Sequence, residues 1–133
     1  MLDLSKFDTS KKANQGQFMQ LLHPGTGAKL FDPETKEPAG LFLMGRDSDA
    51  FIKHNHEKNN SRLKGDVQEQ TSESIRQGNI ELLASLTTGW QHLGYLGDSD
   101  FSRDTIIQLY SDPGYSWIYE QANLWADNRA NFI

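Results

Sequence analysis

Short apolar runs in the first third of the chain are separated by turn-forming residues. Residues 18–22, mostly apolar with Gln20 among them, and the apolar run at 41–44 are of strand length. The His-Pro-Gly-Thr-Gly cluster at 23–27 and the proline-containing loop at 32–38 favour turns, because glycine adopts positive φ and proline fixes its own φ. Residues 29–31 lie between these turns and are placed to pair back. We therefore predict a small antiparallel β-hairpin or sheet.

The segment before this sheet lacks a sustained hydrophobic period. Leu2, Leu4 and Phe7 stand among polar residues, and Gly16 ends the segment. Such a segment offers no continuous apolar face that could pack on a core. We therefore predict that residues 1–16 form a mobile N-terminal arm.

Helix start signals and helical spacing follow after the apolar run at 41–44. The Asp-Ser-Asp sequence at 47–49 offers side-chain oxygens that can cap a polar helix running to about Lys64. Ser102 and Asp112 predict the starts of two later helices. Between the polar helix and Ser102, a second helix is predicted from apolar side chains at helical spacing: Ile75, Leu82, Leu83, Leu86 and Trp90.

The last helix carries the clearest stripe, and burial of its two indoles would contribute several kcal/mol at ~25 cal/mol per Å². The stripe comprises Trp117, Ile118, Gln121, Leu124, Trp125 and Asn128. The predicted fold is α+β and mainly α, with a small N-terminal antiparallel sheet followed by about four helices. Since 133 residues suit one domain, we predict a single globular domain over 17–133, with a β-hairpin region at 17–45 and a helical region at 47–133.

Composition excludes several classes of protein. The chain has no cysteine, which excludes disulfides, thiolate zinc sites and cysteine nucleophiles. No apolar run approaches the ~20 residues of a membrane span, so we expect a soluble intracellular protein.

Residues 1–64 carry ten Lys and Arg against eight Asp and Glu, whereas residues 65–133 carry three Lys and Arg against ten Asp and Glu. The acidic half repels phosphate backbones, so nucleic-acid binding, which would depend on Lys53, Lys58 and their neighbours, is disfavoured.

Candidate chemical sites are few. His54 and His56 would point away from each other on a helix, so we predict no metal site and no cofactor. The Asp-Ser-Asp sequences at 47–49 and 98–100 lack the rest of a calcium loop and fit helix caps. His23 and His92 are single histidines typical of turns or packing, and we predict no enzyme. A hydrogen bond from either of them to a carboxylate in a cleft would reopen the enzyme class.

The C-terminal third resembles a known family. The sequences Leu-Tyr-Ser-Asp-Pro at 109–113, Trp-Ile at 117–118, Glu-Gln at 120–121 and Asp-Asn-Arg-Ala-Asn-Phe at 127–132 are similar to the ending of tail assembly chaperones of long-tailed bacteriophages. Similar features upstream are the strand that ends at Gly45, the helix start at 47–48 and the stretch at 84–90. The resemblance begins near residue 17 and does not include the His-Asn-His sequence.

The resemblance implies a non-enzymatic protein of the bacterial host cytoplasm that coats the phage tape-measure protein, keeps it soluble and helps recruit tail-tube subunits. It also implies absence from the mature virion, and the chain would be the shorter of two forms related by a ribosomal frameshift. An apolar groove that buries amphipathic helices would suit this role. The expected contact residues are Trp117, Tyr119, Trp125 and Phe132, with core packing as the alternative for each of them.

Two other classes stay open at this point. The first is a structural or connector protein of a phage particle, which would remain in the virion. The second comprises enzymes and regulators, for which the sequence offers no constellation. Self-association into dimers or rings is compatible with coating a long chain, but the sequence gives no interface.

Overall fold

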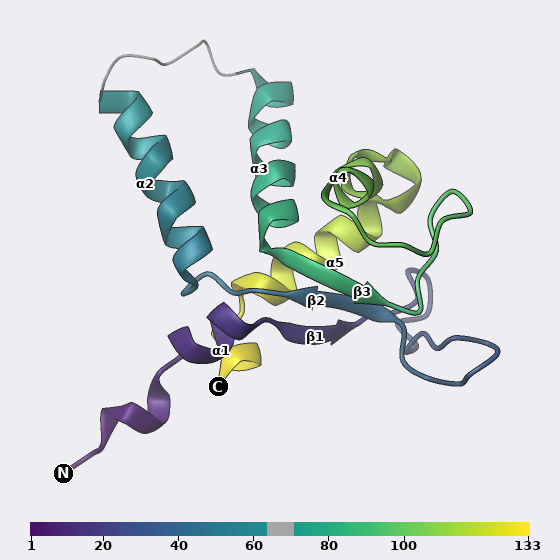
Figure 1. Ribbon diagram of the computed structural model, residues 1–133, viewed down its shortest axis with the longest axis horizontal. Helices are drawn as coiled ribbons and strands as arrows, with labels where there is room; N and C mark the ends of the chain where they lie inside the picture. Colours follow the sequence, from purple (N-terminus) through teal and green to yellow (C-terminus); the bar gives the residue numbers. More distant parts are fainter. Residues whose placement is uncertain (64–70) are drawn as a thin grey trace.

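The computed structural model describes residues 1–63 and 71–133, which form an α+β fold that is mainly helical (Figure 1). The predicted helix end at Lys64 lies outside these residues. In chain order the elements are η1 (Leu4–Phe7), α1 (Ser10–Gln15), β1 (Gln17–Gln20), β2 (Gly40–Leu43), α2 (Asp49–Leu63), α3 (Ser72–Leu86), β3 (Thr87–Gln91), α4 (Arg103–Ser111), η2 (Pro113–Tyr115), α5 (Ser116–Asp127) and η3 (Arg129–Phe132), where η marks a 3₁₀ turn.

The described residues form a three-stranded antiparallel sheet with β2 in the middle. Leu41 of β2 lies opposite Met19 of β1 on one side and opposite Trp90 of β3 on the other. Leu41 and Leu43 are completely buried, which fits alternate positions of a strand that face a core. The predicted fold class is confirmed, but the sheet is not N-terminal. Helix α1 precedes it, and its third strand follows two further helices.

The third strand occupies a segment that we predicted to be helical. The prediction of a helix over residues 75–90 is wrong after Leu86, because Thr87–Gln91 forms β3. Threonine and glycine are weak helix formers. The Thr87 hydroxyl donates to the Leu83 carbonyl at 2.7 Å, which satisfies a backbone group at the helix end. Pairing with β2 then satisfies the strand's own backbone groups, so a tertiary contact overrides the helical spacing.

Three predicted helix starts have a side-chain cap, whereas the cap predicted at 98–100 is wrong, because Asp98 accepts from the Asp100 amide in a loop and α4 begins only after Ser102. The Ser102 hydroxyl accepts a hydrogen bond from the amide three residues further on, at the start of α4. The Asp112 carboxylate accepts from the amide two residues further on, at the turn that leads into α5. Ser48 accepts from the Phe51 amide at 3.3 Å at the start of α2. Each cap satisfies an amide that has no partner inside its own helix.

The apolar core lies between the sheet and helices α3, α4 and α5, which Figure 1 shows grouped beside β2 and β3. The stripe predicted for α5 is partly wrong, since Leu124 is 73% exposed. Ala122 and Ala126 are buried instead, in line with Ile118. Small side chains at these positions allow α5 to pack closely on β2 and α3.

The first sixteen residues are not wholly an arm. Helix α1 packs against α2 and η3, and the Ala13 side chain is buried. The Asn14 side chain accepts a hydrogen bond from the Asp49 amide at 2.7 Å, and Gly45 donates its amide to the Ala13 carbonyl. Ala13 and Asn14 make these contacts through single side chains and the backbone. The sequence did not predict them, because the segment has no repeating pattern of apolar residues. Before α1, Leu2, Leu4 and Phe7 stay exposed, and the N-terminus projects away from the fold (Figure 1).

Candidate interaction surface

The four side chains predicted as partner contacts lie in or against the apolar core. Trp117, Tyr119 and Trp125 are half-buried, and Phe132 is only 1% exposed. The rings of Trp125 and Phe132 meet edge to face with centroids 5.3 Å apart, and Tyr119 meets Tyr110 at 5.9 Å. Aromatic pairs of this geometry stabilise packing. Phe132 therefore has almost no surface to offer a partner, whereas the other three keep partly exposed edges.

Phe132 and Arg129 hold the chain end against the loop between β2 and α2. A Cβ atom on Gly45 would lie 2.9 Å from a Phe132 ring carbon, so only glycine lets the ring approach this closely. Arg129 donates from Nε and Nη2 to the two Asp47 carboxylate oxygens at 2.8 and 3.1 Å. The Thr9 hydroxyl donates to the same carboxylate at 2.6 Å. These hydrogen bonds, those of Arg129 foremost, hold the pKa of the Asp47 carboxyl below its usual range.

The segments that carry the family resemblance meet at this contact. Gly45 and the Asp-Ser pair at 47–48 face the C-terminal sequence at 127–132, although Asp47 and Arg129 are 82 positions apart in the chain. The contacts between the start of α2 and the end of the chain explain why Gly45, Asp47, Arg129 and Phe132 are the residue types that they are. Sequence reasoning did not pair them, because no local pattern links residues so far apart.

The large apolar side chains that are exposed belong mostly to other elements. Ile52 on α2 is 46% exposed and Ile75 on α3 is 49% exposed, and Leu124 on α5 is more exposed than either. The remaining ones lie in the N-terminal segment, the loops and the chain end: Met1, Leu2, Leu4, Phe7, Leu22, Phe31, Leu96, Tyr115 and Ile133. We did not predict any of these as contacts, although the thin apolar content of α2 was a signal that this helix packs weakly.

A hollow of about 280 Å³ opens between α2, α3 and α5. We call it the α2–α3–α5 hollow, and its lining residues are Arg46, Phe51, Leu82, Leu83, Leu86, Asn123, Ala126 and Asp127. The apolar members come from all three helices. At its edge, Arg46 Nη1 lies 3.3 Å from Asp127 Oδ1, and both side chains are substantially exposed. An exposed ion pair of this kind contributes at most ~1 kcal/mol, so a partner can displace it.

A second hollow lies beside the same end of α2 and is mainly polar. Its volume is about 350 Å³, and its lining residues are Arg46, Asp47, Phe51, Ile52, Asn55, His56, Asn59 and Arg129. Both of its arginines are paired with carboxylates. His56 lines this hollow and His54 does not. Within residues 1–63 and 71–133, no cluster of three or more acidic or histidine side chains has an arrangement that could hold a metal ion.

His92 lies between two carboxylates beside a third hollow, of about 490 Å³. Its Nδ1 is 3.0 Å from an Asp32 oxygen and its Nε2 is 2.7 Å from a Glu37 oxygen. The hydrogen bond with Glu37, and then the charges of both carboxylates, raise the pKa of His92 above its usual value. The contact that we expected to reopen the enzyme class is thus present.

Both ring nitrogens of His92 contact carboxylates of the same loop. Each ring nitrogen faces a carboxylate oxygen, and in the protonated ring both nitrogens can donate to these partners. Ser99 lines the same hollow, and its backbone carbonyl accepts from Trp90 Nε1 at 2.8 Å. His92 therefore ties the loop that contains Asp32 and Glu37 to the end of β3.

In the described part of the chain, no helix has both the length and the apolar character needed to cross a membrane. The comparisons with protein-family models, with curated proteins and with solved structures gave no match.

Proposed function

We propose that this protein is a non-enzymatic tail assembly chaperone of a long-tailed bacteriophage. It binds helical segments of the tape-measure protein in the host cytoplasm, keeps them soluble, helps recruit tail-tube subunits and is absent from the finished virion. The observation that supports this function best is the α2–α3–α5 hollow, with exposed apolar side chains on the helices around it. The resemblance of the C-terminal sequence supports it independently.

The hollow has room for side chains of an amphipathic helix, and its lining is mixed, with apolar side chains beside Arg46, Asn123 and Asp127. Its volume of about 280 Å³ is nearly twice that of an apolar cavity of roughly 150 Å³, which admits a benzene molecule. It can therefore take one or two apolar side chains from a partner. Ile75 precedes Leu82 by seven positions and so lies on the same face of α3. This face extends the apolar surface outward from the hollow, as a helix-binding groove needs.

The alternative is a structural connector of the phage particle. Both functions require contact with other proteins, so the hollow supports either. Mass spectrometry of purified virions separates them, since a connector remains in the particle and a chaperone does not. Stoichiometric presence of this chain in virions contradicts the proposed function.

Co-expression with the tape-measure protein of the same phage tests the function directly. We expect that protein to be soluble only when this chain is present. The variant Asn123→Trp should abolish the effect, because Asn123 is exposed at the edge of the hollow and a bulky ring there fills it without removing a core side chain. Leu96→Trp, in an exposed loop after β3, is the matched control and should keep full effect. Circular dichroism must show that both variants remain folded, and equal solubility with and without the chain rules the function out.

A further inference from the structure

Helices α2 and α3 project from the sheet as two prongs above the α2–α3–α5 hollow (Figure 1). We call the facing sides of these helices the α2–α3 fork. Phe51 of α2 and Leu82 of α3 line the hollow at its base. Lys58 follows Phe51 by seven positions and Ile75 precedes Leu82 by seven. A spacing of seven returns to the same helix face, so Lys58 and Ile75 lie two turns further out on the two sides of the fork.

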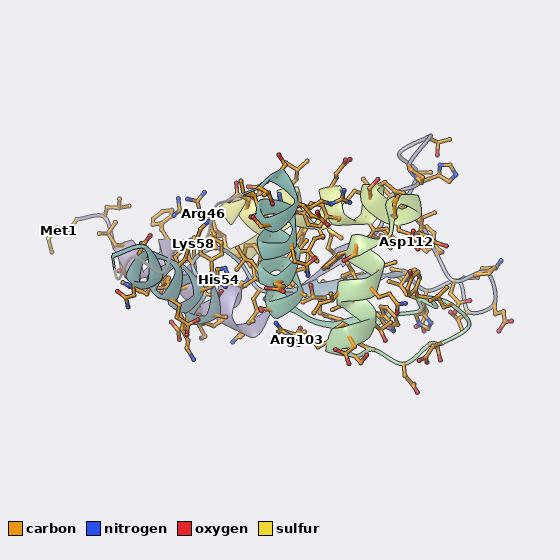
Figure 2. The ribbon with its side chains drawn as sticks, turned by 90° about the horizontal axis from the view of Figure 1, so that it is seen from above. Met1, Arg46, His54, Lys58, Arg103 and Asp112 are labelled. Carbon is orange, nitrogen blue, oxygen red and sulfur yellow. The ribbon has the colours of Figure 1, made fainter. Side chains whose placement is uncertain are left out.

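The α2 side of the fork is polar and cationic. In the view from above, Arg46, His54 and Lys58 lie on the side of α2 that is nearer to α3 (Figure 2). Lys58 is exposed and forms no ion pair with any described residue. Arg46 stands at the base, where its only described ion pair is the exposed one with Asp127. On this side, Lys58 is therefore a cation without an ion-pair partner among the described residues, whereas Arg46 is paired.

The α3 side of the fork is more apolar than the α2 side, although Asn79 lies between Ile75 and Leu82 on the same face. Ile75 is about half exposed, and Leu82 and Leu86 continue its face down to the hollow. α3 has two acidic residues. Glu73 lies two positions before Ile75, and Glu81 lies one position before Leu82. Residues one or two positions apart do not share a helix face. The two sides of the fork thus differ in chemistry, one being more apolar and the other cationic.

We propose that the α2–α3 fork binds an amphipathic helix whose apolar face is bordered by acidic residues. The apolar side chains of this helix pack on Ile75, Leu82 and the hollow, and its acidic border faces Lys58 and Arg46. This inference rests on the proposed function and adds the charge of the bound segment to it. Residues 65–133, which include α3 and α5, carry ten acidic against three basic side chains, so the attraction for an acidic border comes from the α2 side alone. Such complementarity fixes the orientation and choice of partner more than the total affinity.

Three labelled helical peptides of one length test the proposal. They share a leucine-rich apolar face and carry Glu, Gln or Lys along its border. In fluorescence anisotropy at about 0.15 M salt, we expect the Glu peptide to bind about tenfold more tightly than the Lys peptide, with the Gln peptide between them. Lys58→Glu should weaken binding of the Glu peptide about fivefold. Lys53→Glu makes the same charge change on the outer face of α2 and should leave binding unchanged.

Each other outcome overturns the charge preference. Equal affinity for the three peptides contradicts it while leaving the proposed function intact, because an apolar face is then sufficient. An equal loss in Lys53→Glu and Lys58→Glu shows a general charge effect rather than a site in the fork. An oligomer in light scattering that Lys58→Glu dissociates shows that a second copy of this chain occupies the fork. Absence of binding by all three peptides overturns the fork as a binding site, and the co-expression experiment then decides the proposed function separately.

Discussion

Replacement of Phe132 by alanine tests whether the chain end is part of the core or a contact for a partner. The ring is almost completely buried, packs edge to face on Trp125, and leaves no room for a Cβ atom on Gly45. Replacing Phe132 by alanine removes a buried aromatic ring and leaves a cavity. Gly45 beside it has no side chain that could fill this cavity. Loss of a buried phenylalanine costs ~3–5 kcal/mol in a well-packed core.

We expect about 3 kcal/mol, the lower end of that range, because a chain end can partly collapse into the space. Unfolding entropy is roughly 2.1 cal/mol/K per residue, which gives about 0.28 kcal/mol/K for the 133 residues. The variant Phe132→Ala should therefore lower the Tm by about 11 °C. Ile133→Ala is the matched control, since Ile133 is 62% exposed, and it should change the Tm by less than ~2 °C.

Thermal and urea unfolding followed by tryptophan fluorescence measure both variants. Trp125, whose ring contacts Phe132, also reports a local change in the folded state. A Tm decrease in Phe132→Ala no larger than that in Ile133→Ala would show that the ring contributes little to stability. The C-terminal contact would then have to be assigned to binding.

Three further substitutions probe the fold and its charges. Gly40→Ala should destabilise the protein by about 3 kcal/mol or more in urea unfolding, because its Cβ would lie 2.0 Å from the Met19 carbonyl oxygen. Asp47→Asn should lower the Tm at pH 6, and the difference from wild type should shrink as pH falls below ~4. The lowered pKa of Asp47, caused chiefly by Arg129, gives a stabilisation that is present above the unfolded pKa and lost as pH falls through the folded one. His92→Gln should show the opposite trend, because a raised pKa stabilises below ~6.5 and the benefit is lost as pH rises through the folded pKa. Tm profiles from pH 3 to 9 check both, and parallel profiles for variant and wild type would contradict the assigned ion pairs.

Local signals in the sequence predicted the elements that form from nearby residues. Ser102 caps α4 as expected, and Asp112 caps the 3₁₀ turn η2 that leads into α5. The His-Pro-Gly-Thr-Gly cluster at 23–27 forms a turn in which His23 Nδ1 accepts from two nearby amides, at 3.0 and 3.2 Å. Capping and turn geometry involve residues within three positions of each other, so the sequence contains most of the information they need.

The candidate surface was much less predictable than the fold class. The aromatic side chains chosen from the sequence pack largely inside the protein, and the hollow depends on Phe51, Leu82 and Ala126 from three different helices. A hydrophobic side chain looks the same in the sequence whether it fills a core or borders a hollow. Only the positions of the neighbouring helices decide which of the two it does.

The sequence by itself determined a mainly helical α+β domain, its helix starts and the uneven charge of its two halves, because these depend on composition and on residues close together in the chain. The tertiary structure alone decided that Thr87–Gln91 is a strand, that Arg129 pairs with Asp47 and that Phe132 is buried against Gly45. The physical reason is that each of these depends on partners far away in the chain. Strand pairing with β2 and burial of the last ring outweigh local propensities that are worth less than ~1 kcal/mol per residue.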